Sequence, residues 1–307
     1  MYPLHQYVRG FLFLVGATSL WGISGTVAKY LFNQQVDPFH LVTVRLTLSF
    51  LILFAYLAFA KPDLLRVKKS DLRYLTILGL GIAMVQFSYF YTISQTNVAT
   101  AVFLQYLAPG MMVAYAFAFQ GERVGGAKLA ALLLTLGGGY LILVGVPGGG
   151  FAVNTRGFIS GIVSALSLAF YTIYGKIGLS GLNPWTLLVY GFGFGALGAN
   201  LLTPPWVTLV GHSANEWGFF LYIAVFATVI PFGLYFKGLK DLSTVITGLT
   251  STLEPVVAAA VAFLVLGERM YPLQLLGCGM ILSGVVFIQC LPRAGAVKVT
   301  KTQKSPI

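Results

Sequence analysis

The stretch "STLEPVVAAAVAFLVLGER", residues 251–269, places a carboxylate, Glu254, and a proline, Pro255, directly before a long apolar run. A charged side chain at the centre of a membrane-spanning helix costs at least ~2.5–3.5 kcal/mol on insertion scales, so such residues are rare and mark binding sites or proton relays. Glu254 is therefore the first candidate for chemistry, either by binding a cationic amine or by carrying a proton.

Hydroxyl groups precede Glu254 at helical spacing. Thr247, Ser251 and Glu254 share one face of a helix over 243–267, and we expect that face to line a water-filled cavity. Pro255 cannot donate to the carbonyl of Ser251, which predicts a kink in the helix. The competing interpretation is a structural Glu254, neutralised by Lys29, by Arg45 or by the hydroxyl groups.

A second stretch, "YLAPGMMVAYAFAFQGER" at residues 106–123, repeats this pattern at an offset of 146 residues. Pro109 corresponds to Pro255 and predicts a second kink, while Ala108 stands where Glu254 would be. We infer a tandem duplication, with units 1–149 and 150–307. Because one copy lacks the carboxylate, the fold does not require one in both copies, and this asymmetry favours a functional Glu254.

Composition indicates a membrane protein. The chain of 307 residues is 57% hydrophobic and 9% charged, against about 25% charged residues in soluble domains. Segments of about 20 apolar residues are long enough to span a bilayer. Ten recur, at 9–30, 39–60, 72–94, 98–120, 127–146, 157–179, 184–203, 216–238, 243–267 and 271–291.

Five segments in each unit is an odd number, so the second unit must enter the membrane from the opposite side. The predicted fold is an all-α membrane protein with ten transmembrane helices arranged as two inverted five-helix repeats. Inverted repeats are typical of secondary transporters, whose sites lie near the midplane between the repeats.

The charges report topology. Most of the 19 Lys and Arg residues fall in the loops and termini of one side, whereas Arg156 and Arg269 fall on the other. The positive-inside rule then predicts a multi-pass protein of the cytoplasmic (inner) membrane with both termini in the cytoplasm. The net charge of +11 thus gives no reason to expect a nucleic-acid partner. No metal-ligand cluster or phosphate-binding motif is present, so we expect no cofactor and no metal.

Four segments carry a family resemblance: "LWGISGTVAKYLF", "VRLTLSF", "ATAVFLQYLAPGMMVAYAFAFQGER" and "TLEPVVAAAVAFLVLGER". From about residue 11 to 291 the chain resembles the ten-helix EamA-type branch of the drug/metabolite transporter superfamily. The resemblance implies a central cavity lined mainly by helices 1, 3, 4, 6, 8 and 9, with helices 5 and 10 more peripheral. Similar members export amino acids or related small metabolites, and more distant ones move nucleotide sugars or sugar phosphates.

The other candidate residues are polar or aromatic side chains within the spans. Gln105 corresponds to Ser251 under the repeat, and aromatic rings could hold a cationic amine; packing is the alternative role for each ring. The predicted substrate-binding residues are Glu254, Ser251, Thr247, Gln105, Tyr89, Gln86, Trp21, Tyr171 and Tyr235. Arg45 is interpreted as a structural or gating charge.

These observations predict a secondary active transporter that exports amino acids or related small polar metabolites by alternating access, with Glu254 as the candidate for proton coupling. The partners are a small-molecule substrate and the lipid bilayer. The alternatives are exchange of sugar phosphates or nucleotide sugars, a membrane-embedded enzyme, and a channel or scaffold. Glycines at 137–139, 277, 279 and 284 suit either internal packing or a dimer interface, so monomer and homodimer both stay open.

Overall fold

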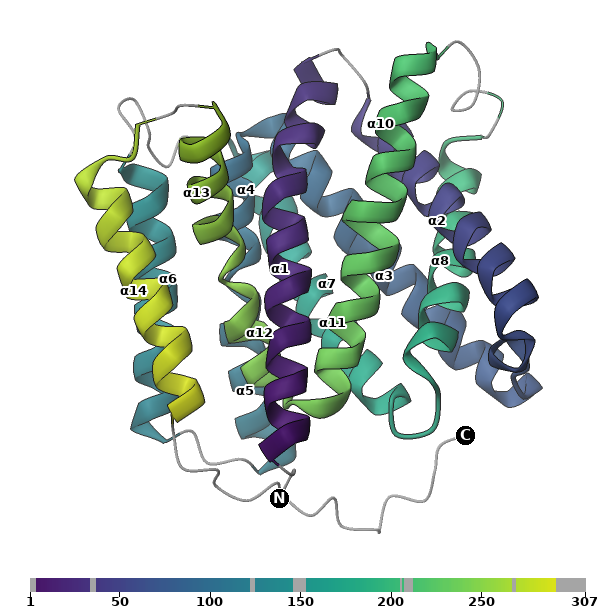
Figure 1. The fold of residues 1–307 in the computed structure, drawn as a ribbon, viewed down its shortest axis with the longest axis horizontal. Coiled ribbons are helices and arrows are strands. Elements are labelled where there is room, and N and C mark those ends of the chain that lie inside the picture. Colours follow the sequence, from purple (N-terminus) through teal and green to yellow (C-terminus); the bar gives the residue numbers. More distant parts are fainter. Residues whose placement is uncertain are drawn as a thin grey trace.

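A computed structural model of the chain describes residues 4–33, 37–121, 125–145, 153–204, 206, 212–266 and 269–290. These residues form a bundle of helices (Figure 1). The first repeat contains α1 (Leu4–Asn33), α2 (Pro38–Ala60), the short 3-10 helix η1 (Pro62–Leu65), α3 (Lys69–Gln95), α4 (Val98–Gln105), α5 (Ala108–Gln120) and α6 (Gly126–Val144). The second contains α7 (Thr155–Gly178), α8 (Pro184–Leu202), α10 (Ala214–Ala224), the π-helical turn η2 (Val225–Val229), α11 (Ile230–Asp241), α12 (Thr244–Ser251), α13 (Glu254–Leu266) and α14 (Pro272–Cys290).

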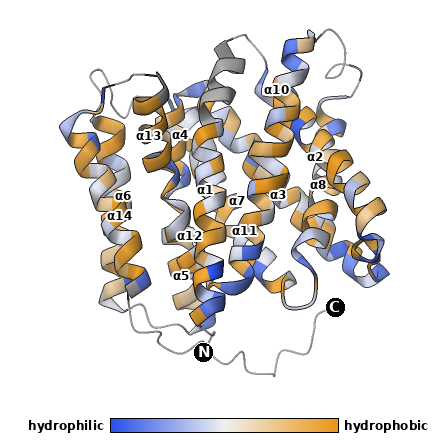
Figure 2. Cartoon of the chain, viewed as in Figure 1, coloured by the Kyte–Doolittle hydropathy of each residue, from blue (hydrophilic) through white to orange (hydrophobic). Residues whose placement is uncertain are grey.

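The helices have the length and surface of membrane spans. Within the described residues, nine segments are long and apolar enough to cross a bilayer. The 30 residues of α1 add a tenth helix, about 45 Å long at 1.5 Å per residue. Apolar residues occupy much of the length of the helices (Figure 2), and many large apolar side chains are exposed; Phe59, Phe119 and Leu201 are more than three-quarters exposed. The predicted all-α membrane fold is confirmed.

The duplication appears in the backbone as well as in the sequence. Helix α4 has 8 residues and α5 has 13, with a break at 106–107 between them; α12 and α13 have the same lengths and break at 252–253. The two breaks are therefore related by the same 146-residue offset. The predicted boundary between the units falls within 146–152, outside the described residues, so it stays a prediction.

Helix caps recur at the same offset. Asp37 caps α2 and Asn183 caps α8, each accepting hydrogen bonds from the first turn and each followed by proline. Asn97 caps α4 and Ser243 caps α12 in the same way. Side-chain oxygens at these positions satisfy backbone N–H groups that a helix start would otherwise leave unpaired. The local sequence thus determines where these helices start in both repeats.

The two repeats interlock. Helix α1 packs against α11, while its counterpart α7 packs against α3, the counterpart of α10–α11. Each repeat thus places its first helix on the third span of the other. The residues between these four elements therefore come from both repeats.

Helices α6 and α14 pack together at one edge of the bundle (Figure 1). A Cβ atom on Gly138 would lie 2.5 Å from the carbonyl oxygen of Gly277, and one on Gly277 would lie 2.5 Å from that of Gly138. The repeat-related contact is similar: a Cβ atom on Gly284 would lie 3.0 Å from the carbonyl oxygen of Ala131. These glycines therefore serve close packing within one chain, the first of the two roles that the sequence left open.

Candidate functional site between the repeats

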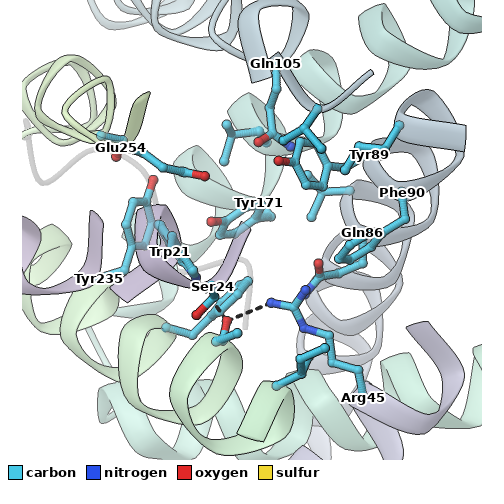
Figure 3. A pocket seen from close by; sticks show the side chains of 18 of the residues that line it. Trp21, Ser24, Arg45, Gln86, Tyr89, Phe90, Gln105, Tyr171, Tyr235 and Glu254 are labelled. Atoms are coloured by element: carbon cyan, nitrogen blue, oxygen red, sulfur yellow. Dashed lines mark hydrogen bonds between the residues drawn. The ribbon is translucent and has the colours of Figure 1, made fainter. Parts of the chain in front are cut away.

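One cavity of about 100 Å³ lies between the repeats (Figure 3). One water needs about 10–15 Å³ of such volume, so the cavity has room for several waters or a small solute. Its walls come from both repeats, and Arg45 of α2 is among them. The lining residues are Trp21, Ser24, Arg45, Val85, Gln86, Tyr89, Phe90, Ile93, Val98, Gln105, Tyr106, Leu168, Tyr171, Ile223, Ala227, Phe232, Tyr235, Ser251 and Glu254.

Glu254 stands at a helix break. It is the first residue of α13, directly after the interruption at 252–253. The repeat-related break between α4 and α5 holds Tyr106, whose hydroxyl donates a hydrogen bond of 3.0 Å to Glu254 Oε2. The two breaks thus meet through one side-chain contact at the cavity wall.

The prolines account for where the helices break. Because Pro109 and Pro255 lack an N–H, the carbonyls of Gln105 and Ser251 lose their helical donors. The turn at 252–253 is tighter than an α-helix, with Leu253 N–H bonded to the Thr250 carbonyl at 3.1 Å. The sequence predicts kinks at these prolines; the structure places a two-residue turn, at 106–107 and at 252–253, just before each of them.

Arg45 enters the cavity from α2. It is only 6% exposed, and its Nε donates to Thr228 Oγ1 at 2.6 Å while Nη2 donates to the Ala227 carbonyl at 2.7 Å. Its guanidinium also lies 5.4 Å from the centre of the Phe90 ring. The predicted structural role is visible in these bonds, but Arg45 also lines the cavity.

The acceptors for Arg45 arise from η2 in the third span of the second repeat. In a regular α-helix the Ala227 carbonyl would bond to the N–H of residue 231, which is proline and has none. That oxygen accepts instead from Arg45 and from Trp21 Nε1, the latter at 3.1 Å. π-Helical turns are frequent at functional sites, and this one anchors α1 and α2 to the second repeat.

The two charged groups of the cavity do not touch. In Figure 3, Glu254 and Arg45 lie on opposite sides, with Tyr171 between them. No carboxylate of the described residues comes within 4.0 Å of the Arg45 guanidinium. A direct ion pair with Arg45, one structural interpretation of Glu254, is therefore not formed; the side chain of Lys29 lies outside the described residues.

Eight of the nine predicted substrate-binding residues line this cavity, and Thr247 does not. Thr247 is fully buried on α12. The expectation assumed one continuous helix from 243 to 267, in which Thr247 and Glu254 would share a face. The break at 252–253 ends that periodicity, so Glu254 reaches the cavity without Thr247.

The sequence reasoning missed Tyr106 and Ser24. The sequence analysis selected residues on the helical face that contains Gln105 and Ala108, and residue 106 does not lie on that face. The break at 106–107 changes which side chains face the cavity. A usable signal was present, because Tyr106 corresponds to Thr252 under the 146-residue offset and both lie three residues before a proline.

The cavity lies toward the end of the bundle opposite Leu4, the first described residue. Trp21 and Ser24 belong to the later half of α1, and Gln86 and Tyr89 to the later half of α3. Both of these halves point to the end of the bundle opposite the N-terminus (Figure 1).

Side-chain contacts join the helices at the end that carries the N-terminus. Arg9 of α1 forms two hydrogen bonds with Asp241 of α11, at 3.0 and 3.1 Å. Lys176 of α7 donates to the carbonyls of residues 239, 240 and 242. Tyr74 and Tyr174 stack with ring centres 4.2 Å apart. At the opposite end, the repeat-related contact among the described residues is one exposed hydrogen bond of 3.3 Å, from Asn154 Nδ2 to the Gln95 carbonyl.

Comparison with known proteins accounts for this architecture. The sequence profile of the EamA-like transporter family matches the chain twice, over residues 8–144 and 155–290. The chain belongs to the EamA-like transporter family. The two matches coincide with the two repeats seen in the helices.

Relatives of this EamA-like protein include named transporters. It is 29% identical over 288 residues to the uncharacterized inner membrane transporter YicL of Salmonella typhimurium, covering 91% of this chain and 95% of YicL. It is 27% identical over 276 residues to the threonine/homoserine exporter RhtA of Escherichia coli, covering 89% and 88%. A crystal structure with 20% identity covers 92% of this chain and 97% of its own, with a TM-score of 0.76, and shares the fold.

The family and its relatives establish the general activity. The protein is a multi-pass transporter of the inner membrane, and the predicted membership of the drug/metabolite transporter superfamily is confirmed.

Proposed function

We propose that this EamA-like protein exports amino acids or closely related small polar metabolites through the cavity between its repeats. The observation that carries the proposal is the cavity itself, which presents one carboxylate, Glu254, and aromatic walls such as Trp21 and Tyr171. A carboxylate beside aromatic rings is suited to an amine. The named activity of RhtA, export of threonine and homoserine, supports the same substrate class.

The arrangement of the repeats supports alternating access. Among the described side chains, the contacts of Arg9 and Lys176 join helices at one end of the cavity, whereas the repeat-related contact of Asn154 at the other end is a single bond. With the termini in the cytoplasm, as the distribution of Lys and Arg predicts, these contacts favour an outward-facing state. An inward-facing state would form when the interlocked repeats exchange their packing, which breaks the Arg9–Asp241 contact.

Glu254 offers a route to proton coupling. One carboxylate cannot hold a substrate ammonium and a proton at the same time, so the two would occupy it in turn. Export of substrate would then be linked to proton entry. Tyr106 holds the carboxylate in place through its 3.0 Å hydrogen bond.

Exchange of anionic sugar phosphates is the alternative. Arg45 is the one Lys or Arg residue among the described side chains that line the cavity, and a single cation offsets only part of the charge of a phosphate group. Glu254 in the same cavity would oppose a phosphate. These charges favour an amino acid.

Counterflow into proteoliposomes tests the proposal. Vesicles are loaded with each of the amino acids in turn, and uptake of the labelled compound is followed for the purified protein and for protein-free vesicles. We expect saturable uptake that the loaded compound stimulates for at least one amino acid. Stimulation by sugar phosphates alone would establish the alternative, and unsaturable flux without stimulation would indicate a channel.

A further inference from the structure

Gln86 is an unexplained polar group in the cavity wall. Its side chain is 5% exposed, and its Nε2 has no hydrogen-bond partner among the described residues. A buried donor without an acceptor costs about 1–3 kcal/mol, so such groups have a structural or functional reason. In Figure 3 the amide of Gln86 lies beside the guanidinium of Arg45.

Arg45 has donors to spare at the same place. A guanidinium carries five N–H groups, and the structure shows one bond from Nε and one from Nη2. The side chain is more than nine-tenths buried, and no described carboxylate neutralises it within 4.0 Å. A buried cation is stable only where an anion or several polar groups compensate its charge. A bound anion would compensate the charge of Arg45 and accept from its remaining N–H groups.

We infer that Arg45 and Gln86 form a carboxylate-binding subsite, and that the substrates are zwitterionic α-amino acids bound between this subsite and Glu254. The inference rests on the proposed function and refines it. The α-carboxylate accepts from the guanidinium and from the Gln86 amide, and the α-ammonium donates to Glu254. Arg45, Gln86 and Glu254 all line the same cavity, with Glu254 across from the other two in Figure 3, so one bound molecule can present a carboxylate to one side and an ammonium to the other.

This arrangement selects against compounds that carry one of the two charges. An amino acid amide or the corresponding decarboxylated amine would leave Arg45 without its counter-ion. A hydroxy acid would leave Glu254 facing no cation. In either case a buried charge of the protein is left uncompensated, and this strongly disfavours binding of the compound in a desolvated site.

The replacement Gln86→Leu tests the role of the subsite in binding while leaving the fold intact. Leucine is apolar and slightly smaller than glutamine, and Nε2 makes no bond with the described residues that the change would break. We expect the variant to unfold at a temperature equal to or above that of the wild type. Its KM for an exchanged amino acid should rise about tenfold, because a hydrogen bond to a charged group is lost, while its KM for the corresponding amide should change less than about twofold.

The matched control is Gln289→Leu. Gln289 lies on α14, outside the cavity, and bonds to Thr250. It should leave every KM unchanged. The probes are each amino acid that the wild type exchanges, its amide, its decarboxylated amine and the corresponding hydroxy acid, tested as competitors in counterflow.

The outcomes distinguish the two proposals. If no amino acid is exchanged, the proposed function fails and the subsite fails with it. If amino acids are exchanged but their amides compete equally well, or if Gln86→Leu leaves the KM of the amino acid unchanged, the carboxylate subsite alone is overturned. A tenfold rise confined to carboxylate-bearing probes supports it.

Discussion

The variant Glu254→Gln is expected to lose about 100-fold in the kcat/KM of amino acid exchange. Glutamine keeps the size of the side chain and an oxygen that can accept from Tyr106, so the helix break at 252–253 should persist. The variant lacks the negative charge that we assign to the substrate ammonium, and a bond to a charged group contributes up to about 3 kcal/mol, or about 100-fold.

The same substitution removes the titratable group of the cavity. We therefore expect wild-type exchange to vary over about pH 5.5–8 and the residual exchange of Glu254→Gln to be insensitive to pH in that range. A proton gradient should drive accumulation by the wild type and have no effect on the variant. The measurement is counterflow in matched proteoliposomes at several pH values.

Glu216→Gln is the matched control. Glu216 lies in the first turn of α10, where it forms a capping box with Ser213 outside the cavity. Glutamine can serve in the same motif, so transport should keep its wild-type rate and pH profile. Normal, pH-dependent exchange by Glu254→Gln would reduce Glu254 to a packing residue.

The variant Arg45→Met is expected to abolish amino acid exchange while the protein stays folded. The acceptors of Arg45 keep other partners: the Ala227 carbonyl still receives Trp21 Nε1, and the Thr228 hydroxyl still donates to the Ile223 carbonyl. Replacing a buried charge by an apolar side chain of similar size is often neutral for stability. Transport should fall at least 100-fold, because a bond between charged groups is removed from the site.

Lysine at this position tests the geometry. Arg45→Lys restores the charge but not the planar fork that reaches Thr228, Ala227 and a carboxylate together, so we expect exchange between that of Arg45→Met and that of the wild type. Arg66→Met, at an exposed position paired with Asp63, is the control. Wild-type exchange by Arg45→Met would show that the guanidinium only anchors η2.

Local signals made most of the fold predictable. Asp37 before Pro38 and Asn183 before Pro184 start helices through side-chain caps, and the 146-residue offset relates the two. Glu254 stands out as a carboxylate in an apolar span. The same offset then relates Gln105 to Ser251. Residues that are unusual for their segment can be found without a structure.

Contacts between distant segments could not be read in this way. The bond between Arg45 and Ala227 joins residues 182 positions apart and depends on the π-helical turn, which sequence periodicity does not reveal. Tyr106 reaches Glu254 because two helices stop at matching places, and Thr247 misses the cavity for the same reason. The unpaired amide of Gln86 is visible only when its neighbours are known.

The central claim is that the transported amino acid occupies the cavity between the repeats, and chemical protection tests it most directly. Ser24 lines the cavity and donates only to the Leu20 carbonyl of its own helix, so Ser24→Cys is a mild probe once Cys278 and Cys290 are replaced. Ser180→Cys, in an exposed turn, is the reference. Both proteins are treated with a thiol reagent in lipid nanodiscs, where both faces are accessible.

We expect an amino acid that is exchanged in counterflow to slow the modification of Ser24→Cys and to leave that of Ser180→Cys unchanged. The corresponding amide should protect poorly, and Glu254→Gln should remove the protection. Equal modification of Ser24→Cys with and without the exchanged amino acid would contradict a binding site in this cavity.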